Sequence, residues 1–174
     1  VFKDQFNHYT GGKVTFLNDA GGVATAGIFC SYPAAYVSNC TCFLDQFIGT
    51  GLLALFVAVI IDKRNKIPDF LHPILFGAVV CMIGTAFGMN LGYPINPARD
   101  FGPRILGYFV YGSEVFSYHD YYFWIPVIAP LFGAVVGAWS YQIFVGSHIS
   151  DDGTVYKYVE AEMLPLKKNE EEAA

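Results

Sequence analysis

The sequence predicts an all-α membrane protein with three membrane-spanning helices and one short re-entrant helix. Three observations lead to this fold class. The chain of 174 residues is 54% hydrophobic and only 14% charged, whereas soluble domains carry about 25% charged residues. It contains three long apolar runs that are almost free of charge. A polar, proline-rich stretch between the second and third runs carries a helix-start signal but is too short to cross a bilayer.

The three apolar runs are the expected spans. Residues 42–61 form the first, and Asp45 near its start is its only charge. A helix of about 20 residues measures about 30 Å, which is the thickness of the hydrocarbon layer. Residues 73–89 form the second span and residues 124–145 the third. Buried helices of a large soluble protein are the alternative, but three such runs in so short a chain argue against it.

Basic residues give the orientation. The cluster Lys63, Arg64 and Lys66 follows the first span, and clusters of this kind stay on the cytoplasmic side. Residues 62–70 are therefore expected in the cytoplasm, and residues 1–41 and 90–121 outside. The chain returns to the cytoplasm at about residue 147, and we expect residues 149–174 to form an acidic, disordered tail.

The charge and the cysteine pattern argue against a nucleic-acid-binding face and against a metal site. The net charge is −5, without a basic face of the kind that binds nucleic acid. The four cysteines form no C-x-x-C motif, so a metal site is not expected. Cys81 lies in an apolar run and is expected to be buried. Cys30, Cys40 and Cys42 crowd one loop, where a disulfide could form. The Asn39 sequon lies so close to the first span that we expect it to be unused.

Small residues recur at helical spacing in two of the spans. Gly84 and Gly88 form a G-x-x-x-G pattern in the second span, and Gly133 and Gly137 form one in the third. Glycines at this spacing let helix backbones approach closely. We interpret both pairs as helix-packing sites.

The stretch GYPINPARDFGPR, residues 92–104, separates the second and third spans. Asn96 can cap free N–H groups, and Pro97 suits the first position of a helix. We expect a half-helix over about residues 97–107, with Gly107 and Gly112 as the glycines that would end it. Buried in a membrane protein, its positive end would face a watery cavity and repel cations. On an external surface it would be a capped helix with a solvated arginine, and physical reasoning alone leaves both alternatives open.

The motif NPARDFGPR, preceded by GY, resembles the second half of the major intrinsic proteins, and in particular the aquaglyceroporins. The segments TAGIFCSYP (25–33) and DQFIGT (45–50) are similar to that family in the same order. The resemblance covers about residues 20–148, and it implies that residues 42–148 form the second half of a right-handed helix bundle. The first three spans and the first Asn-Pro-Ala motif lie outside it. Because the sequence starts at Val1, we expect it to be partial.

The resemblance also implies roles for individual residues. Asn96, Pro97 and Ala98 match the family motif, and Arg99, Tyr93 and Gly84 match three of the four positions of the family's selectivity filter. Glycine at position 84, where water channels carry histidine, implies a wide filter with Tyr93 as its aromatic wall. Five further positions match the glycerol class rather than water channels: Tyr32, Asp100, Arg104, Pro130 and Leu131.

The implied function is a passive channel for glycerol, other small uncharged solutes and water. The resemblance implies a homotetramer in the cell membrane, without enzymatic activity or cofactor. A water-selective channel and a truncated, non-conducting product that associates with full-length subunits are the alternatives. Asp45 and Gln46 are expected to hold the re-entrant loop in place. The four histidines lie in loops and at span ends, where we expect most to be solvated.

Overall fold

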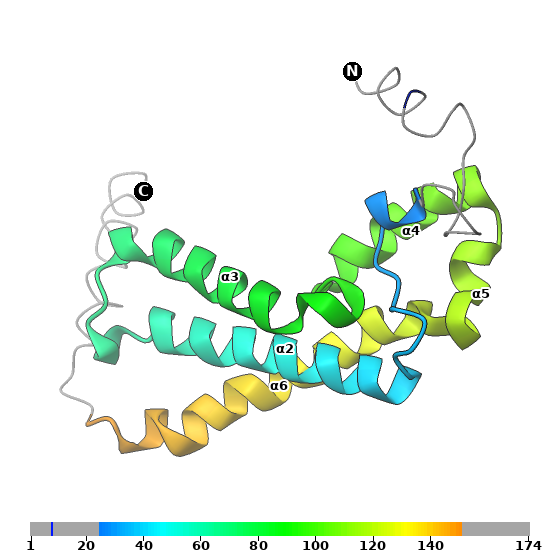
Figure 1. The fold of residues 1–174 in the computed structure, drawn as a ribbon. Coiled ribbons are helices and arrows are strands. Elements are labelled where there is room, and N and C mark those ends of the chain that lie inside the picture. Colours follow the sequence, from blue (N-terminus) through cyan, green and yellow to red (C-terminus); the bar gives the residue numbers. More distant parts are fainter. Residues whose placement is uncertain (1–7, 9–24, 151–174) are drawn as a thin grey trace, which may run out of the picture.

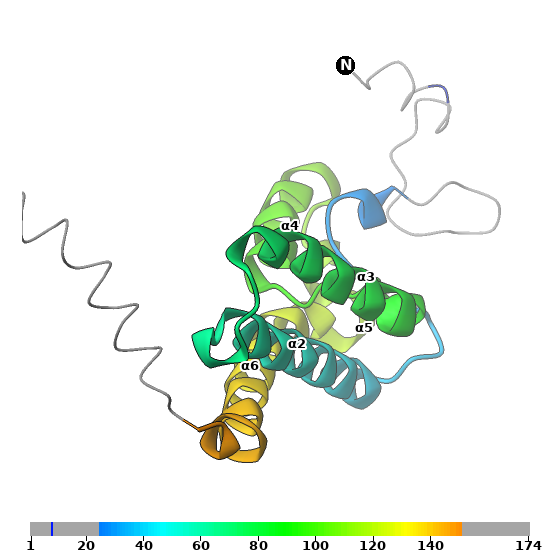
Figure 2. The same ribbon diagram turned by 90° about the vertical axis from the view of Figure 1, so that its left-hand side faces the viewer.

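The computed structural model describes His8 and residues 25–150, and these residues form helices and connecting loops without a strand among them. Three long helices run side by side: α2 (Asn39–Ile61), α3 (His72–Leu91) and α6 (Ile125–Phe144) (Figure 1). Two shorter helices, α4 (Pro97–Tyr111) and α5 (Glu114–Tyr121), lie at one end of this group (Figures 1 and 2). The prediction of three long apolar helices and a short one is confirmed.

Short 3₁₀ turns connect the helices. They are η1 (Ala26–Ile28), η2 (Lys63–Asn65), η3 (Asp69–Leu71), η4 (Tyr122–Trp124) and η5 (Gly146–His148). Three helices with their flanking turns are long and apolar enough to cross a membrane. Helix α2 begins three residues before the expected start of the first span, because the Ser38 hydroxyl accepts a hydrogen bond from the Thr41 N–H at 3.2 Å and caps the helix.

Helix α4 is longer than predicted. It starts at Pro97 as expected, but it continues past Gly107 to Tyr111 and ends at Gly112, which adopts a left-handed φ of 75°. Gly107 is buried inside the helix, where a Cβ would lie 3.7 Å from Val115. The expected end at residue 107 was therefore wrong, and α4 ends at Gly112, the second of the two glycines that the sequence offers as terminators.

Helix α5 was not predicted. Its residues carry no regular apolar pattern, and the backbone leaves helical geometry at its end, where His119 and Asp120 have φ values of 53° and 51°. Tyr121 is also left-handed, with a φ of 61°. These consecutive left-handed residues turn the chain sharply from α5 towards α6.

The closest helix contact joins α2 and α6, and the glycines of α6 make it possible. A Cβ on Gly137 would lie 2.0 Å from the carbonyl oxygen of Gly51, and one on Gly133 would lie 2.2 Å from that of Phe47. Both are far below van der Waals contact, so only glycine fits at either position. The packing interpretation of this glycine pair is confirmed.

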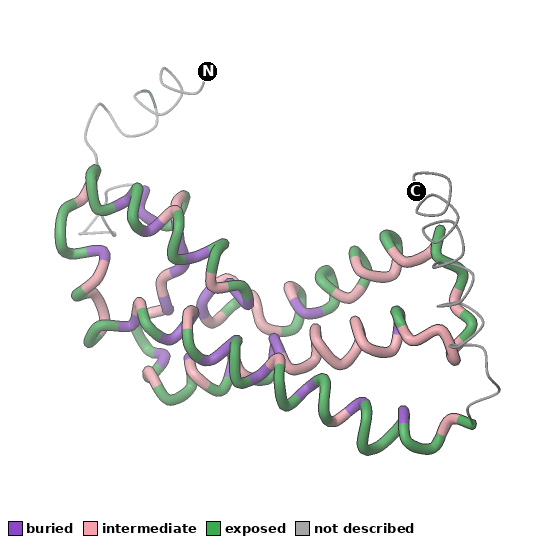
Figure 3. The backbone as a smooth tube through the Cα atoms, turned by 180° about the vertical axis from the view of Figure 1, so that it is seen from behind, coloured by how far each residue is buried: buried purple, intermediate pink, exposed green. Residues whose placement is uncertain are grey.

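Helix α3 is the most exposed of the long helices. Only 6% of its most apolar segment is buried, against 28% for α2 and 33% for the segment that contains α6. Figure 3 shows buried positions gathered where α4 and α5 meet the first turns of α2 and α6. Cys81 on α3 is exposed, so its predicted burial was wrong. The apolar run around Cys81 signals a membrane-spanning helix and does not signal a protein core.

The other end of the bundle is joined by a polar cluster. Arg64 Nη2 lies 2.6 Å from Asp62 Oδ2, and its Nη1 donates to the carbonyl of Gly146 at 2.8 Å. The Tyr141 hydroxyl donates to Asp62 Oδ2 at 2.7 Å. The Arg64 guanidinium holds the pKa of Asp62 at about 2, below its ordinary value. The end of α2 is thereby tied to the end of α6.

Candidate functional site

The connection between α3 and α4 has an unusual backbone. Gly92, Tyr93 and Ile95 have φ values of 78°, 41° and 35°, and left-handed geometry is costly for a β-branched residue such as isoleucine. Two side chains of α2 hold the connection. Gln46 Oε1 accepts a hydrogen bond from the Ile95 N–H at 2.7 Å, and the Thr50 hydroxyl lies 3.5 Å from the Ile95 carbonyl.

Asp45 extends this support to the end of α3. Its Oδ2 accepts a hydrogen bond from Asn90 Nδ2 at 2.8 Å, and its Oδ1 accepts one from Gln46 Nε2 at 3.1 Å. Asp45 and Gln46 are both buried. The prediction that this pair holds the loop is confirmed for Gln46, which bonds Ile95 directly, whereas Asp45 acts through Gln46 and Asn90.

Helix α4 starts as the sequence predicts. Asn96 Oδ1 accepts hydrogen bonds from the N–H groups of Ala98 at 3.0 Å and Arg99 at 3.2 Å, and Pro97 occupies the first turn. This capping leaves the Asn96 amide NH₂ pointing away from the helix end. The positive end of the α4 dipole lies at the same place.

Several polar groups around this helix start have no partner within the described part of the chain. They are Asn96 Nδ2, the Arg99 guanidinium, and the carbonyls of Gly92, Tyr93 and Pro94. Asn96 and Arg99 are exposed. Residues 27–32, Leu91, Gly92 and Arg99 line a cavity of about 160 Å³. Donors and acceptors without protein partners are thus available to a small polar solute.

The Tyr93 ring packs against the glycines of α3. A Cβ on Gly84 would lie 3.0 Å from Tyr93 Cζ, and one on Gly88 would lie 3.3 Å from Tyr93 Cδ1. Among the described residues, the two glycines accommodate this aromatic side chain, so the helix-packing interpretation of this pair is not confirmed. Within this chain, the space above Gly84 is occupied by Tyr93.

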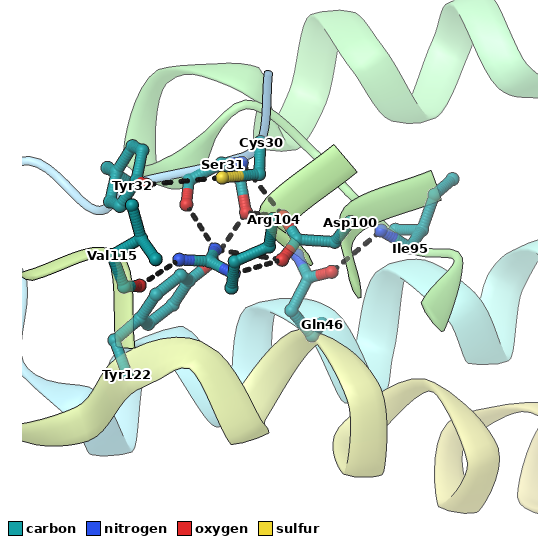
Figure 4. A network of polar contacts seen from close by, with 9 residues as sticks. All are labelled: Cys30, Ser31, Tyr32, Gln46, Ile95, Asp100, Arg104, Val115 and Tyr122. Atoms are coloured by element: carbon teal, nitrogen blue, oxygen red, sulfur yellow. Dashed lines mark hydrogen bonds and ion pairs between the residues drawn. The ribbon is translucent and has the colours of Figure 1, made fainter. Parts of the chain in front are cut away.

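Asp100 and Arg104 form a buried ion pair one turn apart on α4 (Figure 4). Arg104 Nη2 and Nε donate to Asp100 Oδ1 at 2.8 and 3.0 Å. Arg104 Nη1 also donates to the carbonyl of Val115 at 2.8 Å, and Nη2 donates to that of Ser31 at 2.7 Å. The guanidinium lies 4.9 Å from the centre of the Tyr32 ring. The pair therefore joins α4 to α5 and to the loop before α2.

Ser31 supplies further hydrogen bonds to the Asp100 carboxylate. Its N–H donates to Asp100 Oδ2 at 2.8 Å, and its hydroxyl donates to the same oxygen. The Tyr122 hydroxyl lies 3.0 Å from Ser31 Oγ. No sequence pattern pointed to Ser31, because it lies 69 residues from Asp100. The i, i+4 spacing of Asp100 and Arg104 could have indicated their ion pair.

The predicted site residues thus fall into three groups. Residues 92–99 with Gly84 surround the start of α4, and Tyr32, Asp100 and Arg104 form one polar cluster. Pro130 and Leu131 lie on α6, where Pro130 is buried and Leu131 is 55% exposed. Neither of these two apolar side chains takes part in the hydrogen bonds of the polar cluster.

The cysteines and histidines can now be placed in the structure. All four cysteines have free thiols, so the disulfide left open by the sequence is not formed. Asn39 Nδ2 donates to the His119 carbonyl at 3.0 Å, and the His119 ring lies 2.7 Å from the Val37 carbonyl. His72 also contacts a carbonyl, that of Ile67, at 3.3 Å. These two histidines are half-buried, whereas His8 and His148 are exposed.

Residues 11–141 match the model of the family described as "Major intrinsic protein". The chain belongs to the major intrinsic protein family. This family consists of membrane channels of the aquaporin and aquaglyceroporin type, so the resemblance stated from the sequence is confirmed. The match begins before the described residues and ends near the end of α6.

Individual members of the major intrinsic protein family agree with this assignment. Aquaporin-10 of Homo sapiens is 44% identical over 85% of the chain and 49% of its own length. Aquaglyceroporin-3 of Trypanosoma brucei brucei is 41% identical over 83% of the chain and 47% of its own length. The crystal structure of the aquaglyceroporin from Plasmodium falciparum superposes with a TM-score of 0.64 at 30% identity, covering 68% of the chain and 50% of that structure. The chain spans about half the length of these relatives.

Proposed function

We propose that the chain forms the second half of a passive channel for glycerol and other small uncharged solutes, and that water also passes. The observation that carries this proposal is the set of partner-free polar groups at the start of α4. A solute with hydroxyl groups can accept hydrogen bonds from Asn96 Nδ2 and Arg99 and donate to the carbonyls of residues 92–94. These groups replace its hydration shell.

The charge distribution argues against the passage of cations. The positive end of the α4 dipole and the Arg99 guanidinium lie at the same site, and both repel cations, including protons. Asp100 directly follows Arg99, but its carboxylate is fully buried and is neutralised by Arg104. The site therefore presents donors and positive potential, without an accessible negative charge from Asp100.

The preference for glycerol over water rests on Tyr93 and Gly84. Glycine at position 84 leaves room for the Tyr93 ring, and an apolar ring beside a fixed donor suits a linear molecule with a carbon side and a hydroxyl side. The relatives named aquaglyceroporins favour the same solute class. A water-selective channel is the second candidate, and it would not need this aromatic wall.

The proposed arrangement in the membrane follows the basic cluster after α2. Residues 62–70 and the tail from about residue 147 lie in the cytoplasm, and residues 1–41 and 90–121 lie outside. Residues 42–148 supply the second half of the channel domain. We also propose that the complete channel subunits assemble into a homotetramer with one pore in each subunit. Residues 1–7, 9–24 and 151–174, including most of the tail, lie outside the described residues.

A pore also needs a wall opposite the start of α4, and the exposed surface of α3 is available for other elements to cover. A third candidate, a product that does not conduct and acts only by associating with full-length subunits, follows if that wall is never supplied. The proposal therefore has to be tested both with the chain alone and with a complementary half.

The test uses lipid vesicles and two proteins. One is the chain alone, and the other is a chimera in which the chain replaces the matching half of Aquaporin-10 from Homo sapiens, with intact Aquaporin-10 as the reference. Light scattering then measures water efflux and glycerol uptake. Glycerol uptake by the chimera supports the proposal. Water flux without glycerol uptake would establish the water-selective alternative, and a membrane-inserted chimera without either flux would establish the non-conducting one.

A further inference from the structure

We propose that Ser31 is a positioning residue for the solute path: its hydroxyl sets the distance between the loop of residues 27–32 and Arg99, and thereby the size of solute that passes. This inference rests on the proposed channel function and adds a residue to it. Ser31 belongs neither to the Asn-Pro-Ala motif nor to the filter positions inferred from the sequence.

Ser31 lies where the cavity wall and the polar cluster meet. It lines the cavity together with Arg99, and it is 7% exposed. Its N–H and hydroxyl both donate to Asp100 Oδ2, and its carbonyl accepts from Arg104 at 2.7 Å (Figure 4). One residue of the loop is thus bound to α4 through three polar groups.

These contacts act on Arg99 through the backbone. Asp100 directly follows Arg99 in the first turn of α4, and Asp100 Oδ1 is already committed to Arg104. Among the residues that the structure describes, only Ser31 donates to its second carboxylate oxygen. The contacts of Ser31 therefore fix the first turn of α4 relative to the loop that faces Arg99 across the cavity.

The hydroxyl of Ser31 can be removed without breaking the ion pair. In Ser31→Ala the N–H still donates to Asp100 and the carbonyl still accepts from Arg104, so both backbone contacts remain. Only the hydroxyl contacts with Asp100 and Tyr122 are lost. We expect a folded protein in which the loop is held less tightly against α4, because bonds to a charged group are among the stronger ones.

The experiment compares the permeability of the Aquaporin-10 chimera to erythritol, a four-carbon linear polyol, with its permeability to glycerol in the same vesicles. Ser31→Ala is expected to raise the erythritol-to-glycerol ratio by about threefold or more, since small displacements of positioning groups have large effects on rates. Ser31→Thr, which retains the hydroxyl, is expected to keep the original ratio. Ser38→Ala is the matched control, because Ser38 lies in the same loop and caps α2 without contacting the cavity or Asp100.

The outcomes separate the two proposals. A parent chimera without glycerol uptake would overturn the channel function and this inference with it. A conducting chimera whose ratio is unchanged by Ser31→Ala, or changed equally by Ser38→Ala, would overturn the inference alone. If Ser31→Ala does not reach the vesicles, Tyr122→Phe takes its place, since it removes the second hydroxyl at Ser31. A smaller rise in the same ratio is then expected, and an unchanged ratio would again refute the role of Ser31.

Discussion

Replacing Gly137 by alanine tests how α2 and α6 are held together. The new Cβ would lie 2.0 Å from the Gly51 carbonyl oxygen and 2.8 Å from Gly51 Cα. Cβ atoms in proteins essentially never come closer than 3.0 Å to another heavy atom, so the helices must separate by at least about 1 Å at this point. The atoms in the way belong to a helix backbone, which cannot rotate aside as a side chain can.

Overpacking of this kind costs about 1–3 kcal/mol in free energy of unfolding. The matched control is Gly77→Ala on α3, where a Cβ meets nothing within 4 Å. Both substitutions gain the higher helix propensity of alanine, so the difference between them isolates the clash. Because α2 also carries Gln46, which holds the Ile95 N–H, the separation is expected to loosen the start of α4 as well.

The assay is unfolding of the purified chain in mixed micelles by titration with a denaturing detergent, followed by circular dichroism. Gly137→Ala is expected to unfold at a lower fraction of denaturing detergent than the parent, and Gly77→Ala at the same fraction or a higher one. The close packing of α2 and α6 would be refuted if Gly137→Ala were as stable as Gly77→Ala.

Three further predictions concern the site and the polar clusters. Gly84→His is expected to displace the Tyr93 ring and to suppress glycerol uptake by the chimera more than water flux, and equal loss of both would contradict the filter assignment. Asp100→Asn leaves a buried arginine without its charged partner and is expected to lower the free energy of unfolding by about 3–5 kcal/mol. The control is Asp69→Asn, which removes an exposed ion pair of the same 2.8 Å length. It is expected to cost about 1 kcal/mol or less in the same detergent titration. The pKa of Asp62 is lowered to about 2, so its stabilising effect is fully present above its ordinary pKa and is lost as the pH falls towards 2. The stability difference between the parent and Asp62→Asn should accordingly shrink in acid, and a difference independent of pH would argue against the ion pair.

The long helices could be predicted because hydropathy and length determine them directly. The start of α4 was equally accessible, since Asn96 and Pro97 act through local backbone chemistry. Its end was less accessible, because Gly107 and Gly112 are both residues that can end a helix, and the local pattern does not choose between them. The helix continues through Gly107 and ends at Gly112.

The site could be predicted as a set of residues but not as an arrangement. The sequence identified Tyr93 and Gly84 separately, and only the structure shows the ring resting on the glycine. Ser31 was missed because serine is common in loops and its partner is distant in sequence. Cys81 was expected to be buried because it lies in an apolar run of the sequence. The outer surface of a membrane helix is as apolar as a protein core, so the run does not distinguish the two.

The structure changes how the five glycerol-class positions are weighed. Tyr32, Asp100 and Arg104 belong to one cluster, in which a buried carboxylate, a buried guanidinium and an aromatic ring depend on one another. An uncompensated buried charge costs several kcal/mol, so a small neutral residue at position 100 requires a neutral residue at position 104 as well. These three positions therefore amount to a single observation about how α4 is anchored. Tyr93 and Gly84, whose shapes fit each other, carry separate information about the width of the proposed solute path.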